Sequence, residues 1–242
     1  MYYASPHYSS YSYDWKYLII LIVLFIVSLI VQGLVSSQYK KYSSVRALSG
    51  LTGAQAAEKI LLARGVTNVQ IKCQGGQDLS DYYDPRDNSI NLSKGVYYSD
   101  SVAAMGIACH EAGHALQQAE SYGPYKLRRA IIPFANVSSR IAMVFILAGF
   151  ILSIWAEHLR FIGMIGVILF AVAVFVQIVT LPVEINASHR ALKLLGSEQI
   201  LTQEELPKAK KVLTAAAMTY VVATLTAVVQ LLRFASLFAR RR

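Results

Sequence analysis

The chain has 242 residues, of which 55% are hydrophobic and only 15% are charged. An average soluble domain carries roughly 25% charged residues, so long uncharged stretches of this chain must face lipid. The formal net charge is +9, but the basic residues do not form a face interleaved with aromatics, and no nucleic-acid partner is expected. They gather instead beside the apolar runs, as membrane-flanking charge does: Lys40, Lys41 and Arg46; Lys126, Arg128 and Arg129; Lys208, Lys210 and Lys211; Arg240, Arg241 and Arg242.

The N-terminal segment predicts a tail followed by a membrane anchor. Residues 1–16 are rich in Tyr and Ser and have little to bury, which is typical of a flexible tail. Residues 17–36 begin with an uncharged run of about 19 residues, enough to cross a bilayer. A cleaved signal peptide is the alternative, but the run is too long for one and no A-x-A site follows it, so an uncleaved anchor is favoured.

Residues 37–129 predict a small soluble α+β domain. Thr52 is a suitable N-cap, and so is Asp100. Asp84-Pro85 opens a turn signal between two strand-like segments. The expected elements are a helix over 52–64, a strand over 69–72, a hairpin of strands 79–83 and 89–93, and a helix over 100–118.

The C-terminal half predicts further membrane helices. Residues 135–183 contain two apolar stretches around Glu157-His158-Leu159-Arg160, which predicts a transmembrane hairpin. Residues 184–211 form a helical and polar stretch, and residues 212–242 form an apolar helix with a basic end. The fold class expected is an α-helical membrane protein with a small α+β domain and about four transmembrane or membrane-associated helices.

The distribution of basic residues predicts the orientation in the membrane. Lys40, Lys41 and Arg46 follow the first apolar run, whereas Lys16 before it is offset by Asp14, which puts residues 37–129 in the cytoplasm. Lys208, Lys210 and Lys211 agree with this orientation. Arg233 and the terminal arginines disagree if residues 212–232 cross, so either that helix is re-entrant or interfacial, or the rule is broken there.

The motif His110-Glu111-Ala112-Gly113-His114 lies in the helix over 100–118. Residues four apart share a face of a helix, so both imidazoles can bind one zinc ion. Glu111 is offset by about 100° and can act as the base on a zinc-activated water. The alternative is a helix that carries two histidines and a glutamate by chance, but burying them in an apolar helix without partners is costly.

Catalytic zinc normally has a third protein ligand. Gln117 stands where a metzincin pattern needs glycine, and Glu120, six residues after His114, lies on the wrong face of a continuing helix. Two crossings return the chain to the side of the motif just before Glu184, which follows Pro182 at the mouth of an apolar segment. Glu184 is the best candidate, and an interfacial charge is its alternative reading. Other acidic residues on that side lie in a polar stretch: Glu198, Glu204 and Glu205.

The chain resembles the bacterial membrane-bound neutral zinc metallopeptidase family (YugP type). The stretches that carry the resemblance are 51–54, 81–86, 91–93, 101–104, 110–114 and 181–188. The resemblance implies a zincin-like domain in the bacterial plasma membrane, with zinc held by His110, His114 and Glu184 and with Glu111 as the base.

More distant membrane gluzincins typically place an Asp four residues after the third ligand. Here Ser188 stands in that position, with Asn186 two residues before it. Their hydroxyl and amide groups can orient ligands but add no charge. His189 and Arg190 follow, and each is either a further residue around the site, where it could stabilise an oxyanion, or an ordinary interfacial base.

The expected function is that of a membrane-bound zinc endopeptidase acting on peptides or proteins, membrane proteins included. Two alternatives are a zinc-binding scaffold without significant activity, which would not need Glu111, and a metal transporter, which would carry ligands within its crossings. Strand 89–93 is either an exposed edge that binds substrate by strand addition or part of a packing hairpin.

Overall fold

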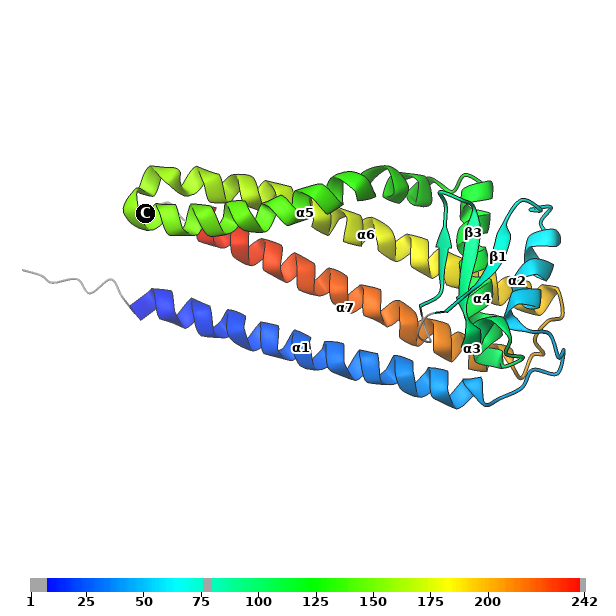
Figure 1. The fold of residues 1–242 in the computed structure, drawn as a ribbon. Coiled ribbons are helices and arrows are strands. Elements are labelled where there is room, and N and C mark those ends of the chain that lie inside the picture. Colours follow the sequence, from blue (N-terminus) through cyan, green and yellow to red (C-terminus); the bar gives the residue numbers. More distant parts are fainter. Residues whose placement is uncertain (1–7, 76–79, 240–242) are drawn as a thin grey trace, which may run out of the picture. The chain divides into compact units, whose positions relative to one another are not determined.

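Four long helices dominate the structure, a computed structural model that describes residues 8–75 and 80–239. Within these residues, four helices are long and apolar enough to cross a membrane: α1 (Tyr8–Ser43), α5 (Gly123–Trp155), α6 (Arg160–Ser197) and α7 (Leu206–Ala239). The other elements are α2 (Gly53–Leu62), β1 (Gln70–Gln74), β2 (Tyr82–Asp84), β3 (Ser89–Ser93), α3 (Lys94–Tyr97), α4 (Val102–Ala119) and the 3-10 turn Glu157–Leu159 (Figure 1). The predicted fold class is confirmed.

Two helices begin earlier than predicted. Helix α1 starts at Tyr8, so residues 8–16 of the predicted tail are helical, because each residue added to an existing helix gains a hydrogen bond without a new nucleus. Helix α5 starts at Gly123 instead of near residue 135. Residues 1–7 of the predicted tail, residues 76–79 with Leu79 of the predicted hairpin, and the terminal arginines lie outside the described residues.

The long helices contribute to two compact units. The first comprises Met1–Gln32, Ile132–Gln177 and Val221–Arg242, and the second comprises Gly33–Ile131 and Ile178–Tyr220. The soluble domain predicted over residues 37–129 therefore corresponds to only part of the second unit, which also includes Ile178–Tyr220. Residues of α6 and α7, among them Val183, Leu195 and Ala209, lie in one core with those of α2 and α4.

In the first unit, the helix segments pack through small and aromatic residues. Ile146, Val167 and Phe238 form a buried cluster. A Cβ on Gly149 would collide with the backbone of Gly163, so α5 and α6 approach each other closely there. The guanidinium of Arg160 donates to the carbonyl of Leu237 at 2.8 Å, which joins the start of α6 to the end of α7.

The second unit contains a sheet in the order β1-β3-β2, with β3 parallel to β1 and antiparallel to β2. The predicted hairpin is thus confirmed. However, β3 is the central strand of the sheet, and its side chains Ile90 and Leu92 are fully buried. The hypothesis that strand 89–93 is an exposed edge is wrong. Alternation of polar and apolar residues shows which face of a strand is buried and does not show its neighbours.

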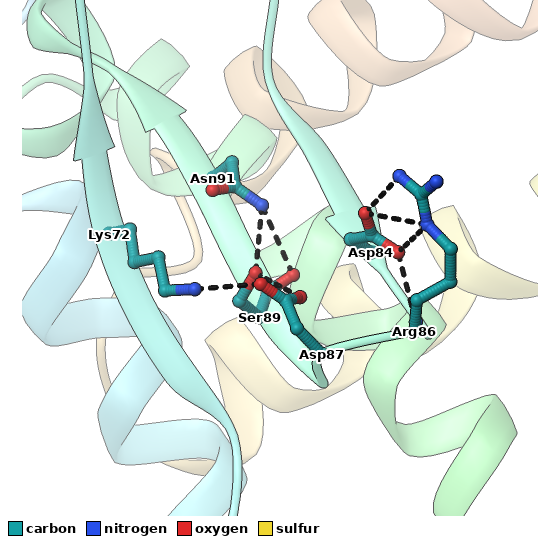
Figure 2. A network of polar contacts seen from close by, with 6 residues as sticks. All are labelled: Lys72, Asp84, Arg86, Asp87, Ser89 and Asn91. Carbon is teal, nitrogen blue, oxygen red and sulfur yellow. Dashed lines mark hydrogen bonds and ion pairs between the residues drawn. The ribbon is translucent and has the colours of Figure 1, made fainter.

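Polar side chains stabilise the turn between β2 and β3 (Figure 2). The carboxylate of Asp84 accepts hydrogen bonds from the backbone N–H of Arg86 at 2.9 Å and from its guanidinium at 2.6 Å. These bonds lower the pKa of Asp84 to about 2. The carboxylate of Asp87 accepts from Lys72 of β1 at 2.7 Å and from Ser89 of β3 at 2.6 Å. The turn therefore links all three strands and holds the short strand β2 in register.

Helix α4 is capped one residue later than predicted. The hydroxyl of Ser101 accepts a hydrogen bond from the backbone N–H of Ala104 at 3.2 Å, whereas Asp100 pairs with Arg46 at 3.5 Å. The predicted cap of α2 is confirmed, because Thr52 and Gln55 form a reciprocal capping box. Small, buried alanines along α4 let α2 pack closely against it.

Candidate metal centre

Helix α4 carries the motif on a face that is almost closed to solvent. The side chain of His110 is 15% exposed and that of His114 is 9% exposed. Glu111 is buried as well. Three polar side chains in an apolar core need partners, because unpaired polar groups are costly to bury. Their partners come mainly from α6.

A glycine in the motif allows α6 to approach. A Cβ on Gly113 would lie 2.7 Å from the carbonyl oxygen of Ala187, so only glycine permits this separation of the two backbones. Glu184 and Ser188 are four residues apart on α6 and therefore share a face. The close crossing brings both of them to the histidines of α4.

Three side chains converge as metal ligands do. The Oε2 atom of Glu184 lies 3.3 Å from Nε2 of His110 and 3.5 Å from Nε2 of His114. Tetrahedral ligands bound at roughly 2.0–2.1 Å are separated by about 3.3–3.4 Å, which these distances match. The same Oε2 atom is buried and makes no hydrogen bond to any described residue. Two imidazoles and a carboxylate whose buried oxygen lacks a hydrogen-bond partner form a ligand set that fits a catalytic zinc ion.

Each histidine has its other ring nitrogen held by a neutral side chain. Nδ1 of His110 lies 3.0 Å from the hydroxyl of Ser188, and Nδ1 of His114 lies 3.0 Å from Oε1 of Gln117. A ring that donates from Nδ1 presents its Nε2 lone pair to a metal. The Gln117 carbonyl oxygen only accepts, so it favours the tautomer of His114 that can bind zinc, and the Ser188 hydroxyl can accept from the same tautomer of His110.

Gln117 continues this network to the surface. Its Nε2 donates to the carbonyl of Val183 at 2.8 Å and to Oδ1 of Asn186 at 2.9 Å. Arg190 donates to the same Oδ1 at 2.7 Å and pairs with Glu120. Asn186 and Arg190 thus connect to His114 through Gln117, and Ser188 contacts His110. That these residues support a metal site stays a prediction. Gln117 was not among the predicted site residues, although its position three residues after His114 puts it on the same helix face.

His189 does not join this network. It is exposed on α6 and makes no hydrogen bond to a described residue. It lines a separate cavity together with Arg64 and Lys193. Arg190 is engaged by Asn186 and Glu120, so its guanidinium is not directed at the metal ligands.

The carboxyl group of Glu111 has the environment of a proton acceptor. Burial raises its pKa to about 7, the nearby charges of Glu184 and Asp81 add to this, and the charge of His110 and a hydrogen bond with the backbone of Tyr83 oppose it. Tyr83 belongs to β2, an edge strand of the sheet. A carboxyl group with a raised pKa exchanges protons near neutral pH more readily than an exposed one.

Two further residues contact Glu184 and were not identified from the sequence. Nη1 of Arg128, counted above among the membrane-flanking charges, lies 3.3 Å from Oε1 of Glu184. The phenol of Tyr220 on α7 also interacts with this carboxylate. Arg128 follows His114 by 14 residues in a different helix and Tyr220 follows it by 106, so no helix repeat connects either of them to the motif.

A cavity of about 200 Å³ opens beside these groups. Glu111, Glu184 and Tyr220 line it together with residues from several elements: Val35, Asp81, Ile107, His110, Ser188, Leu213, Ala216, Ala217 and Thr219. Glu111 and two of the three converging side chains, His110 and Glu184, therefore face one space that a substrate can occupy.

Known proteins resemble this chain over most of its length. A family model described as "Putative neutral zinc metallopeptidase" matches residues 17–239. The "Putative membrane protease YugP" of Bacillus subtilis (strain 168) is 45% identical over 208 residues, which cover 86% of this chain and 90% of the relative. No solved structure matches the chain.

Proposed function

The chain belongs to the neutral zinc metallopeptidase family, and on this premise we propose that it is a membrane-bound zinc endopeptidase with Glu111 as its general base. The observation that carries the proposal is the convergence of His110, His114 and Glu184 beside that buried carboxyl group. A scaffold would need the three ligands and would have no use for a base that faces the same cavity.

The three ligands would hold the zinc ion, with Ser188 and Gln117 orienting the imidazoles. Bound zinc would lower the pKa of a water molecule and polarise the scissile carbonyl group. Glu111 would take a proton as the water oxygen bonds to the carbonyl carbon. It would then pass this proton to the amine nitrogen as the C–N bond breaks.

Tyr220 is the side chain best placed to donate a hydrogen bond to the developing oxyanion. Three hydroxyl groups line the cavity. The hydroxyl of Ser188 contacts His110, and that of Thr219 donates to the carbonyl of Ala216 at 2.7 Å. The phenol of Tyr220 interacts with the Glu184 carboxylate and with the charges of Glu111 and Arg128, and it lines the cavity that a substrate would enter.

The direct test replaces Glu111 by glutamine, which removes the base and keeps the size of the side chain. The purified Glu111→Gln protein should retain zinc and should cleave casein or a peptide about 10²–10⁴ times more slowly. Glu58→Gln, an equivalent change at an exposed position of α2, is the matched control. Cleavage at the wild-type rate by Glu111→Gln would refute the proposal. Zinc binding by the wild type without cleavage of any substrate in a broad panel would favour the scaffold.

The proposal also covers the localisation of the protein and its orientation in the membrane. Four apolar helices and the description of the Bacillus relative as a membrane protease support an integral membrane protein. We propose that the catalytic residues face the cytoplasm, since Lys40, Lys41 and Arg46 follow the apolar run of α1. Protein or peptide substrates and the lipid bilayer are the partners that this arrangement requires.

A further inference from the structure

The cavity at the metal centre is lined by both polar and apolar side chains. Its polar groups are those of His110, Glu111, Glu184 and Ser188 on α4 and α6, together with Asp81, Thr219 and Tyr220. Ile107 of α4 adds an apolar side chain, and the long helices provide an apolar wall: Val35 of α1 and Leu213, Ala216 and Ala217 of α7. A polar side chain that displaces water from an apolar wall is left without partners, while an apolar one gains free energy by leaving water. The cavity therefore favours an apolar side chain beside the scissile bond.

The size of the cavity is set by small residues on α7. Its volume is about 200 Å³, the share of roughly seven waters in liquid water and enough for one large side chain. Ala216 and Ala217 line it, while the larger Met218, next along the helix, does not and is 42% exposed. Replacing either alanine by a bulky residue would fill the space next to the base.

The apolar wall belongs to helices with the composition of membrane spans. Leu213, Ala216 and Ala217 lie at the start of the apolar run of α7, and Val35 lies at the end of the run of α1. On α6 the apolar run ends at Leu181, only three residues, or about 4.5 Å of helix, before Glu184. The catalytic residues thus lie next to the points where the apolar runs of these helices end. Polypeptides that enter or leave the bilayer pass through this depth.

We propose that this enzyme cleaves membrane-inserted polypeptides next to a large apolar residue, leucine or phenylalanine, whose side chain enters the cavity, and that Ala216 and Ala217 set the upper size limit. The inference rests on the proposed endopeptidase function and adds its substrate class. It assigns to α7 a role in specificity that is separate from the chemistry at His110, Glu111 and His114.

The test compares Ala217→Phe with Met218→Phe, which adds a ring on the same helix outside the cavity. Quenched fluorescent peptides would carry Phe, Leu, Ala or Lys next to the scissile bond. The wild type and Met218→Phe should prefer Phe and Leu. Ala217→Phe should lose about 10-fold or more in kcat/KM for these two peptides and keep most of its activity on the Ala peptide. An unchanged order of preference in Ala217→Phe would overturn the inference.

Binding provides a readout without catalysis. In zinc-loaded protein with Glu111→Gln, fluorescence anisotropy should show that adding Ala217→Phe weakens binding of the Leu peptide about 10-fold, whereas adding Met218→Phe leaves it unchanged. Equal binding in both double variants would also overturn the inference. If the wild type cleaves no substrate at all, the proposed function fails first, and the two failures are therefore distinguishable.

Membrane insertion is tested with one cleavage sequence in two contexts. The sequence is presented either as a free peptide or directly beside a transmembrane helix, with both enzyme and substrate in phosphatidylcholine–phosphatidylglycerol vesicles. The inserted form should be cleaved at least about 10-fold faster, because the bilayer holds it at the depth of the cavity. Equal rates for the two forms would contradict the membrane part of the proposal.

Discussion

In the imidazole rings of His110 and His114, Nδ1 contacts a neutral side chain and Nε2 lies within 3.5 Å of Oε2 of Glu184. The sequence could predict that the two histidines and Glu184 lie together, because the helix repeat puts the histidines on one face and the count of crossings brings Glu184 to their side of the membrane. It could also suggest Ser188 from its distance to Glu184. The contacts of Arg128 and Tyr220 depend on how separate helices pack, and no periodicity in the sequence reports that.

Gln117 should influence the affinity for zinc although it is uncharged and is not itself a proposed ligand. Gln117→Leu removes the acceptor for Nδ1 of His114, so zinc should bind about 10–100 times more weakly, measured by competition with a chelator. Gln117→Glu keeps an acceptor and should recover part of this loss. Gln118→Leu, at the half-buried neighbouring position, should bind zinc normally. Wild-type affinity in Gln117→Leu would show that the contact does not orient the ring.

At the scale of elements, the centre depends on the distance between α4 and α6. The zinc motif requires two histidines and a glutamate, and any residue can occupy its two remaining positions. Gly113 is nevertheless constrained by the backbone of Ala187. This constraint could not be read from the sequence, since a glycine inside a helix ordinarily lowers confidence that the helix continues.

Two glycines of α4 should respond oppositely to the same substitution. Gly113→Ala places a methyl group 2.7 Å from the carbonyl oxygen of Ala187. The helices must then separate, at a cost of about 1–3 kcal/mol in the free energy of unfolding and with weaker zinc binding. At Gly106 a Cβ would meet Ala209 at 3.6 Å, an ordinary contact. Gly106→Ala should therefore be neutral or more stable by up to about 1 kcal/mol.

Thermal unfolding in detergent and zinc content measure both effects. If Gly113→Ala were as stable as the wild type and fully loaded with zinc, the close crossing of α4 and α6 would not be required for the centre.

At the scale of the whole molecule, hydropathy was sufficient to predict the four long helices, and turn residues were sufficient for the hairpin. The order of the strands and the membership of residues 178–220 in the second unit were not predictable. Both depend on pairing between distant segments, whereas composition and periodicity are local properties. The strand suggested as a substrate platform proved to be central for this reason.

The proposed cytoplasmic orientation can be tested with a native cysteine. Cys73 is exposed on β1 and Cys109 is buried on α4, so Cys73 should be the residue that reacts in the folded protein. A membrane-impermeant maleimide should label it only after the cells are permeabilised, and a permeant maleimide should label it in intact cells. Labelling of intact cells by the impermeant reagent would place the catalytic residues outside.

The central claim is that α4 and α6 together build one zinc centre, and zinc content per chain tests it most directly. The wild type and Glu204→Ala, which changes an exposed acidic residue on the polar stretch before α7, should each bind about one zinc ion, the number that one His₂Glu site holds. Glu184→Ala should lose most of its zinc while remaining folded. A Glu184→Ala protein that keeps one zinc ion per chain would contradict the account.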